Sequence, residues 1–250
     1  MDKIDYTVSK TNLYEQIAET LEQAIVGAEI KAEKLPSEQE LAKRFKVSRT
    51  VIREALKVLK ERGLIRSRNG EGSYISKPNI DTISSAINRI VQMDNISNDH
   101  LHDMRLILET AGAGLAALHA GPEDIAHLQY TVDQMSVQPL STEQRLRFDS
   151  EFHITIARAS GNKLLEMFVE VMTLLLGDYM IKGFPGPASM RQVINHHEKI
   201  FEAIKNGNPE DAEEAIRCHL AAALENIKKY EKKDRKGSEK NKSLLAERRL

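Results

Sequence analysis

The stretch LPSEQELAKRFKVSRTVIREALKVLKERGLI, residues 35–65, carries the local signals of two short helices joined by a tight turn. Ser37 and Glu40 have the spacing of a capping box, in which a hydroxyl and a carboxylate satisfy free backbone amides at the start of a helix. The first helix is therefore expected to begin after Ser37 and to end near Phe45. Residues 46–47 are then left to form the turn.

The second helix of the pair is expected from Arg49 to about residue 62, because Ser48 can cap its start and Gly63 is a natural stop. An earlier helix is indicated by apolar residues at helical spacing, namely Leu13, Ile17, Leu21 and Ile25. After the pair, the β-prone runs LIRSR and SYIS flank the turn residues NGEG, which predicts a hairpin. Residues 1–76 thus have the element order of a winged helix-turn-helix domain.

Charge is distributed unevenly along the chain, although the formal net charge is only −1. Residues 1–78 hold 15 Lys and Arg against 12 Asp and Glu, residues 79–227 hold 11 against 21, and residues 228–250 hold 10 against 4. Between Lys43 and Arg68 there are 10 basic and 2 acidic residues. Such a basic stripe in a small unit is typical of polyanion binding, whereas the acidic middle segment would repel DNA. Charge alone leaves open that both are solvated faces of one domain.

In a helix-turn-helix domain, the start of the second helix meets base edges in the major groove of DNA. Here that segment is SRTVIRE, and Arg49 and Arg53 lie four residues apart on one face. Arginine binds guanine O6 and N7 with two hydrogen bonds, while the hydroxyls of Ser48 and Thr50 suit phosphate oxygens. The opposite face is expected to pack against the other helices through Ile52, Ala55, Leu56 and Leu59. The alternative is an exposed helix whose charges serve only solubility, but the order of the surrounding elements favours DNA binding.

The segment from LPSE through VSRT and REAL to GLI, followed by the wing residues GEGSYI, resembles the DNA-binding domain of the GntR superfamily of bacterial transcription regulators. The resemblance covers about residues 11–76. It implies that Arg49, Thr50 and Arg53 contact DNA, with Ser48, Gln39 and either Gly70 or Gly72 nearby. Gln39 stands where the family often has arginine, and Glu71 where a basic residue is common, so the operator sequence is not implied.

Beyond the basic unit, Pro78 and the polar residues around it indicate a linker at 77–82. The chain is then helical almost throughout, with helices expected at 83–93, 98–119, 122–135, 141–159, 163–182, 189–205 and 209–230. Medium helices joined by short loops favour an antiparallel bundle over residues 83–230, so the fold class is mainly α. The charged residues 231–250 contain few large apolar side chains and are expected to be disordered.

Polar side chains occupy the apolar faces of three of these helices. Asp149 and His153 lie four residues apart on one face, and His197 and His219 each lie on the apolar stripe of a later helix. His196 is turned about 100° away from its neighbour and is expected at the edge. Buried imidazoles need partners, and a single metal ion would serve all of them. Three histidines and an aspartate suit Zn²⁺, Ni²⁺, Mn²⁺ or Fe²⁺. The alternative is a set of unrelated core histidines, each with its own hydrogen bond.

The second half also resembles the all-helical ligand-binding domain of the FadR branch of the same superfamily, the type called FCD. The matching segments are HDMRLILETAGAGLAA, FDSEFHITIARASGN, HEKIFEAI and IRCHL. The resemblance implies that Asp149, His153, His197 and His219 hold a divalent metal and that Arg105 helps to bind a small carboxylate effector. The alternative for Arg105 is a salt bridge with Glu109, four residues on. His102, near the start of the same helix, is expected at the surface.

These observations predict a metabolite-responsive transcription regulator that binds a palindromic double-stranded operator as a homodimer. A metalloenzyme that uses the His3Asp site and a regulator with a purely structural metal are the alternatives, but the sequence shows no clear nucleophile or general-base motif. One cysteine, Cys218, fits a reducing cytoplasm. No apolar stretch approaches the roughly 20 residues that span a bilayer, and the N-terminus lacks the apolar core of a signal peptide, so we expect a cytoplasmic protein without membrane contact.

Overall fold

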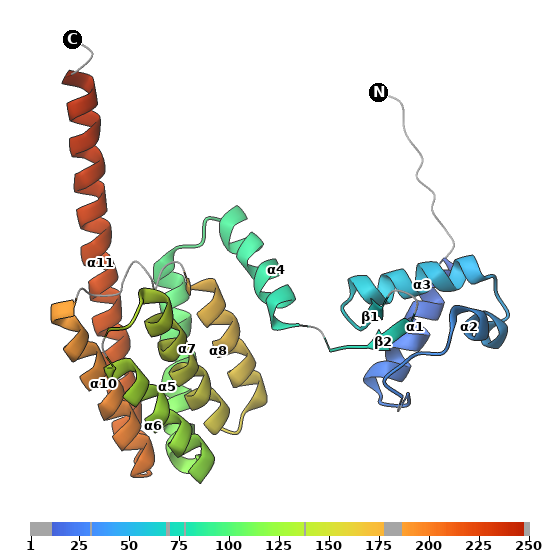
Figure 1. Cartoon of the computed structure of the whole chain (residues 1–250), viewed down its shortest axis with the longest axis horizontal. Coiled ribbons are helices and arrows are strands. Elements are labelled where there is room, and N and C mark those ends of the chain that lie inside the picture. Colours follow the sequence, from blue (N-terminus) through green and yellow to red (C-terminus); the bar gives the residue numbers. More distant parts are fainter. Residues whose placement is uncertain are drawn as a thin grey trace. The chain divides into compact units, whose positions relative to one another are not determined.

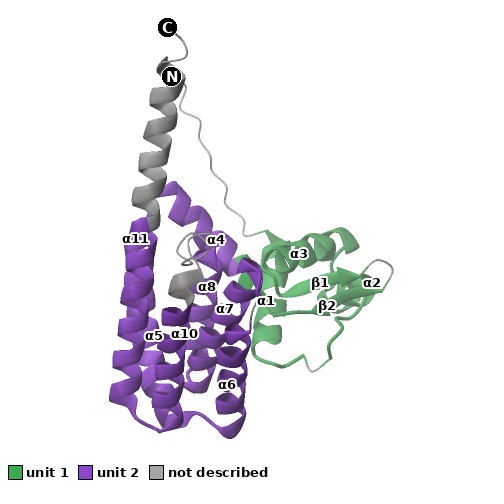
Figure 2. Ribbon diagram, turned by 60° about the vertical axis from the view of Figure 1, so that its left-hand side comes forward, with its two compact units in different colours: residues 1–82 green, residues 83–250 purple. Residues whose placement is uncertain are grey.

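The computed structural model describes residues 12–177 and 187–247, apart from residues 31, 69, 70, 78 and 138. Of residues 187–190 and 230–247 it describes the backbone only. The chain divides into two compact units, residues 1–82 and residues 83–250 (Figure 2). Among the described residues, no helix is both long enough and apolar enough to cross a bilayer.

The first unit has the predicted order of three helices and a hairpin. Its elements are α1 (Leu13–Val26), α2 (Glu38–Phe45), α3 (Arg49–Glu61), β1 (Ile65–Arg68) and β2 (Gly72–Ile75) (Figure 1). The two strands are antiparallel, with Ile65 paired to Ile75 and Arg68 paired to Gly72. This hairpin is the wing of a winged helix-turn-helix domain.

The turn between α2 and α3 is built from two serine caps and one left-handed residue. The Ser37 hydroxyl accepts a hydrogen bond from the backbone N–H of Glu40 at 3.2 Å, and the Ser48 hydroxyl accepts one from Val51 at 3.4 Å. Lys46 adopts a left-handed conformation with φ of 56°, which ends α2 and redirects the chain. The carboxylate of Glu40 pairs with Arg44. Of the two hydrogen bonds of the predicted capping box, the structure therefore has the one accepted by the Ser37 hydroxyl.

Apolar side chains from all three helices and β1 form the core of the first unit. The predicted inward face of α3 is confirmed, because Ile52, Ala55, Leu56 and Leu59 are all buried. They pack with buried residues of the other elements, chiefly Ile17, Ala18, Leu21, Leu41 and Ile65. Burial of this face fixes the rotation of α3 and leaves Arg49 and Arg53, which flank it, exposed to solvent.

The predicted fold class is confirmed in the second unit, whose described elements are all helices. They are α4 (Ile80–Met93), α5 (Asn98–His119), α6 (Pro122–Ser136), α7 (Thr142–Ala159), α8 (Lys163–Leu175), α10 (Pro187–Lys205) and α11 (Pro209–Glu247). The helix α5 packs against α7, α8, α10 and α11, and α6 packs against α7 and α10 (Figure 1). The result is a bundle whose buried core is formed by α5, α6, α7, α10 and α11.

Helix α7 carries half of the predicted metal ligands, and its register is fixed at both ends. At its start, Ser141 and Gln144 form a reciprocal capping box. At its end, Gly161 takes φ of +73°, and the Asn162 side chain then accepts hydrogen bonds from the first amides of α8. Between these limits Phe152 is fully buried in the bundle core. Asp149 and His153 are buried in the same helix, which places both side chains inside the bundle.

Three helix boundaries differ from those expected by three residues or more. Helix α4 begins at Ile80, inside the expected linker 77–82, because the Asn79 side chain accepts a hydrogen bond from the Asp81 amide at 2.7 Å. Helix α8 ends at Leu175, and residues 178–182 of the expected helix lie outside the described residues. The backbone of α11 stays helical to Glu247, through most of the segment expected to be disordered. Lysine, glutamate and arginine have high helix propensity, and the chain contains no proline after Pro209.

Candidate DNA-reading surface and metal centre

The exposed face of α3 presents the side chains predicted to read DNA. Arg49, Thr50 and Arg53 are all exposed, and the two arginine side chains are 63% and 65% accessible. Both guanidinium groups contact Glu38 at the start of α2: Arg53 Nη2 lies 3.2 Å and Arg49 Nη2 3.7 Å from Glu38 Oε2. Glu38 therefore holds the two arginines side by side in the free protein.

The remaining residues of the predicted DNA surface have different local environments. Gln39 is exposed in the first turn of α2, and the Ser48 hydroxyl is engaged as the N-cap of α3. In the wing, Gly72 has φ of +108°, a conformation that favours glycine, and Gly70 lies outside the described residues. The guanidinium of Arg68 lies 4.7 Å from the centre of the Tyr74 ring and 3.6 Å from the carboxylate of Glu71, so its positive charge is partly offset within the wing.

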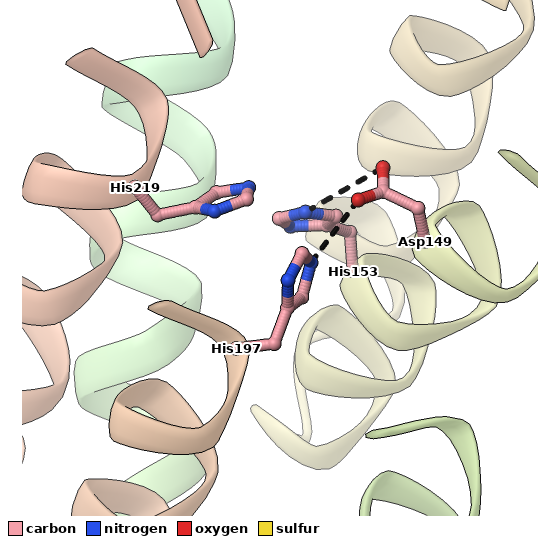
Figure 3. Close-up of side chains that lie close together, drawn as sticks. All are labelled: Asp149, His153, His197 and His219. Carbon is pink, nitrogen blue, oxygen red and sulfur yellow. Dashed lines mark ion pairs between the residues drawn. The ribbon is translucent and has the colours of Figure 1, made fainter. Parts of the chain in front are cut away.

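The four predicted metal ligands come together in the bundle. Asp149 and His153 extend from α7, His197 from α10 and His219 from α11 (Figure 3). All four are buried, and one ligand atom of each lies within 4.8 Å of the ligand atoms of the others. The rings of His197 and His219 are 4.5 Å apart, and those of His153 and His219 are 5.0 Å apart, centre to centre. Separate helices thus place three imidazoles and one carboxylate around a single point.

The orientation of His197 is set by its own helix. Its Nδ1 lies 2.9 Å from the backbone carbonyl oxygen of Val193, one turn earlier in α10. A carbonyl oxygen only accepts, so Nδ1 carries the proton and donates it. The other ring nitrogen, Nε2, lies 3.0 Å from Asp149 Oδ1. If Nε2 holds no proton, its lone pair faces the Asp149 carboxylate. A cation between the two groups would stabilise this arrangement.

His153 contacts a second carboxylate that the sequence did not assign to the site. Its Nδ1 lies 2.7 Å from Glu109 Oε2, although the ring is turned so that this ion-pair contact lacks hydrogen-bond geometry. Its Nε2 lies 4.0 Å from Asp149 Oδ2, on the side of the other ligands. Glu109 extends from α5 and is buried, with 4% of its surface exposed.

The donor set fits a divalent metal ion. Asp149 Oδ2, His153 Nε2 and His197 Nε2 are buried, and none of them makes a hydrogen bond with any described residue. Burial lowers the pKa of His219 well below its usual value, so this ring is neutral and able to donate a lone pair. Burial alone would raise the pKa of Asp149, but contact with His197 and the charge of His153 lower it to about 2, so Asp149 is ionised. Three imidazoles and one carboxylate form a borderline ligand set of the kind that binds Zn²⁺, Ni²⁺, Mn²⁺ or Fe²⁺.

Arg105 is buried beside the cluster and paired with Glu109. Its Nη2 donates to Glu109 Oε2 at 3.3 Å, and its Nε donates to Glu109 Oε1. The salt bridge that the sequence offered as the alternative role of Arg105 is thus present, and it is buried rather than exposed. His102, expected at the surface, is also buried with 7% exposure, because α11 runs beside the first turn of α5, as the Lys228–Asp99 pair at 3.4 Å shows.

Sequence reasoning missed two carboxylates, Glu38 and Glu109. Each acts across a helix–helix contact, to α3 and to α7 respectively. The signal for Glu109 was its position on the alanine- and glycine-rich face of α5, where a carboxylate is unusual. The signal for Glu38 was its place beside the Ser37 cap, which directs the first turn of α2.

A helix-turn-helix with a wing, followed by a helical bundle around a cluster of potential ligands, defines a class of DNA-binding regulators with a sensor domain. The chain belongs to the GntR family of bacterial regulatory proteins: the family profile matches residues 13–75, and the FCD domain profile matches residues 100–222. The predicted GntR and FCD resemblance is thereby confirmed.

Individual relatives support the same assignment over most of the chain. The HTH-type transcriptional regulator LutR of Bacillus subtilis is 33% identical over 78% of this chain and 92% of its own. The HTH-type transcriptional repressor NanR of Cronobacter sakazakii is 32% identical over 85% of this chain and 84% of its own. Among solved structures, Streptococcus agalactiae GntR superposes with a TM-score of 0.67 at 28% identity, covering 84% of this chain and 98% of that one. The chain is therefore a DNA-binding transcription regulator, and an enzymatic role is disfavoured.

Proposed function

We propose that the operator affinity of this regulator is controlled by a small carboxylate that binds at a divalent metal ion in the FCD domain. The observation that carries the proposal is the buried group of Asp149, His153, His197 and His219, with ligand atoms within 4.8 Å of one another. Buried polar atoms without hydrogen-bond partners are costly. A metal ion would compensate several of them at once.

The four side chains would hold the ion, and the ion would supply positive charge and a coordination position for an anionic ligand. Four protein ligands satisfy a tetrahedral ion, whereas octahedral ions keep further positions open. A carboxylate effector therefore fits the octahedral members of the candidate set, or a zinc site that expands its coordination. The ion itself is proposed as a divalent one of the group Zn²⁺, Ni²⁺, Mn²⁺ and Fe²⁺.

Arg105 would contact the effector while it is shared with Glu109. Its guanidinium is paired with both oxygens of Glu109 within the bundle. A guanidinium has five N–H donors, so an incoming carboxylate would share the group with Glu109. We therefore propose the metal as the primary anchor of the effector and Arg105 as a secondary contact.

The DNA-binding side of the proposal rests on Arg49, Thr50 and Arg53, with Ser48, Gln39 and the wing glycines nearby. One recognition helix reads only one half-site, so a homodimer on a palindromic operator with half-sites about one helical turn apart or closer is the arrangement we propose. Effector binding would then alter how the two DNA-binding units are held. Control of affinity requires that the effector bind two arrangements of the protein with different affinities.

Two alternatives use the same cluster. A metalloenzyme would need a general base or nucleophile beside the ion, yet Glu109, the further carboxylate at the cluster, is engaged by Arg105 and lies beside His153. A purely structural metal would stabilise the bundle without any effector. The metalloenzyme predicts turnover of a bound carboxylate. The structural metal predicts an operator Kd that does not change when carboxylates are added.

Operator binding by the metal-loaded, full-length protein is expected to respond to at least one small carboxylate. An operator selected from a random DNA pool would be titrated with the protein in the presence of mono- and dicarboxylates. Typical coupling free energies of about 1–3 kcal/mol predict a change in Kd of roughly 5- to 150-fold. The same titration on chelator-treated protein should show no response.

The neutral amide of each carboxylate is the matched control, because it keeps the size of the ligand and removes its charge. Amides are expected to leave the operator Kd unchanged. If no carboxylate in a broad panel shifted the Kd of protein shown to contain metal, the metal would be structural. Conversion of a carboxylate to product by the same protein would establish the enzymatic alternative.

A further inference from the structure

Glu109 is a buried carboxylate that stands next to the ligand cluster without belonging to it. It lies on α5, whereas the four candidate ligands come from α7, α10 and α11. One of its oxygens, Oε2, lies 2.7 Å from His153 Nδ1 and 3.3 Å from Arg105 Nη2. A chain of contacts therefore runs from Arg105 through Glu109 to His153.

A neutral histidine has one protonated and one unprotonated ring nitrogen, and only the unprotonated nitrogen binds a metal. Nε2 of His153 faces Asp149 and the other ligands, and Nδ1 faces Glu109. A carboxylate oxygen 2.7 Å from Nδ1 favours a proton on that nitrogen. Nε2 is then left with its lone pair directed to the cluster.

His197 shows the same division of roles with a different partner. The backbone carbonyl of Val193 holds the Nδ1 proton of His197, so that Nε2 faces Asp149. Glu109 places a carboxylate oxygen beside Nδ1 of His153 as Val193 places a carbonyl oxygen beside Nδ1 of His197, but through an ion-pair contact without hydrogen-bond geometry. Outer partners of this kind orient metal-binding histidines and raise the basicity of the ligand nitrogen.

Arg105 explains how a carboxylate is kept in this position. An isolated buried carboxylate is costly, whereas one that is paired and hydrogen-bonded is tolerated. The Arg105 side chain is 8% exposed and the Glu109 side chain 3%, so neither group is compensated by bulk water. The guanidinium contacts both carboxylate oxygens and thereby fixes the plane of the group that faces His153.

We propose that Glu109 is a positioning residue for the metal centre, which holds His153 with Nδ1 protonated and Nε2 directed to the ion, and that Arg105 anchors Glu109 for this purpose. The proposal rests on the proposed metal site. It gives Arg105 a role that does not depend on an effector. Arg105 fixes Glu109, and Glu109 in turn orients His153.

The test compares Zn²⁺ binding by full-length wild-type protein and by Glu109→Gln, measured by competition with a chelator of known affinity. Loss of an outer partner of a metal-binding histidine typically weakens metal affinity by about 10- to 100-fold, and we expect a loss in that range. Glu202→Gln is the matched control, because Glu202 is an exposed glutamate of the same bundle that pairs with Lys205. The control variant is expected to bind Zn²⁺ as the wild type does.

A second measurement needs no variant and distinguishes positioning from general stabilisation. The ¹⁵N shifts and ring couplings of His153 in the wild-type protein are expected to show a protonated Nδ1, both without and with Zn²⁺. A proton on Nε2 in the metal-free protein would overturn the proposal, even if Glu109→Gln failed to fold. Glu109→Asp, which keeps the charge but shortens the side chain, should recover part of the lost affinity if it restores the Nδ1 proton.

The outcomes separate this proposal from the one on which it depends. If wild-type protein binds Zn²⁺ and Glu109→Gln binds it equally well, Glu109 has no positioning role, and the metal site itself stands. If wild-type protein binds no divalent ion at all, both proposals fail. Weaker binding by Glu109→Gln with an unchanged His153 tautomer would show that Glu109 supports the fold and does not position the ligand.

Discussion

His197→Ala is expected to lose Zn²⁺ affinity by on the order of 100- to 1000-fold. Structural zinc sites with four ligands contribute roughly 10–16 kcal/mol in total, so one ligand accounts for about 2.5–4 kcal/mol. His197 is fully buried, its Nε2 lies 3.0 Å from Asp149 Oδ1, and its ring adjoins those of His153 and His219. Its removal deletes a ligand and also leaves Asp149 without its nearest partner. Competition with a chelator and metal analysis of purified protein would measure the loss.

His196→Ala is the matched control for this prediction. His196 precedes His197 on the same helix and is only partly buried; its ring centre lies 6.2 Å from that of His219, but it is not among the four residues whose ligand atoms converge. Its removal is expected to leave the Zn²⁺ affinity within about twofold of the wild-type value, because a side chain about 100° away around the helix does not occupy the position of His197. Equal metal content in wild type and His197→Ala would remove His197 from the ligand set. Equal losses in both variants would point to a general effect on the fold.

The four candidate metal ligands could be predicted from sequence because each lies on a helix whose own residues show which face is apolar. Asp149 and His153 are one turn apart, and His197 and His219 lie on stripes completed by Ile200, Phe201 and Ile216, which are buried as expected. Helical periodicity alone therefore shows which way each side chain points. Their convergence follows only from packing. It required the family resemblance, or the bundle itself.

The winged helix-turn-helix was predictable for a related reason. Its boundaries depend on caps and turn residues close in sequence, such as Ser37, Lys46 and Ser48, whose conformations the structure confirms. The hairpin likewise follows from residues within one short segment. Interactions between residues close in sequence determine these elements, so one sequence is enough to predict them.

Contacts between distant residues could not be read in the same way. Glu38 and Arg53 are 15 residues apart and meet across the α2–α3 packing, and Glu109 and His153 meet across the α5–α7 packing. No periodicity relates the two members of either pair. His102 lies near the first turn of α5, beside α11, which begins more than a hundred residues later. Helix α11 also continues past the expected end, because favourable helix propensity does not require a core.

Arg49→Ala is expected to weaken operator binding by about 5- to 150-fold, which corresponds to about 1–3 kcal/mol for an arginine that reads a base. Arg49 lies in the first turn of α3, and its side chain is exposed at the edge of the buried face, so it is available to DNA. In the free protein it contacts Glu38, and DNA binding would exchange this contact for a guanine edge or a phosphate. The Kd for a selected operator, measured at fixed salt concentration, checks the magnitude.

Arg49→Lys separates base reading from simple charge. Lysine keeps the positive charge but cannot present two parallel donors to guanine O6 and N7 in the way the planar guanidinium does. We therefore expect Arg49→Lys to retain affinity for unrelated DNA while losing preference for the operator at one base position. Arg62→Ala is the matched control, because Arg62 lies at the opposite end of α3 and pairs with Glu22 of α1. Full operator preference in Arg49→Lys would make Arg49 a phosphate contact, and the base-reading role would then fall to Arg53, the other exposed arginine held by Glu38.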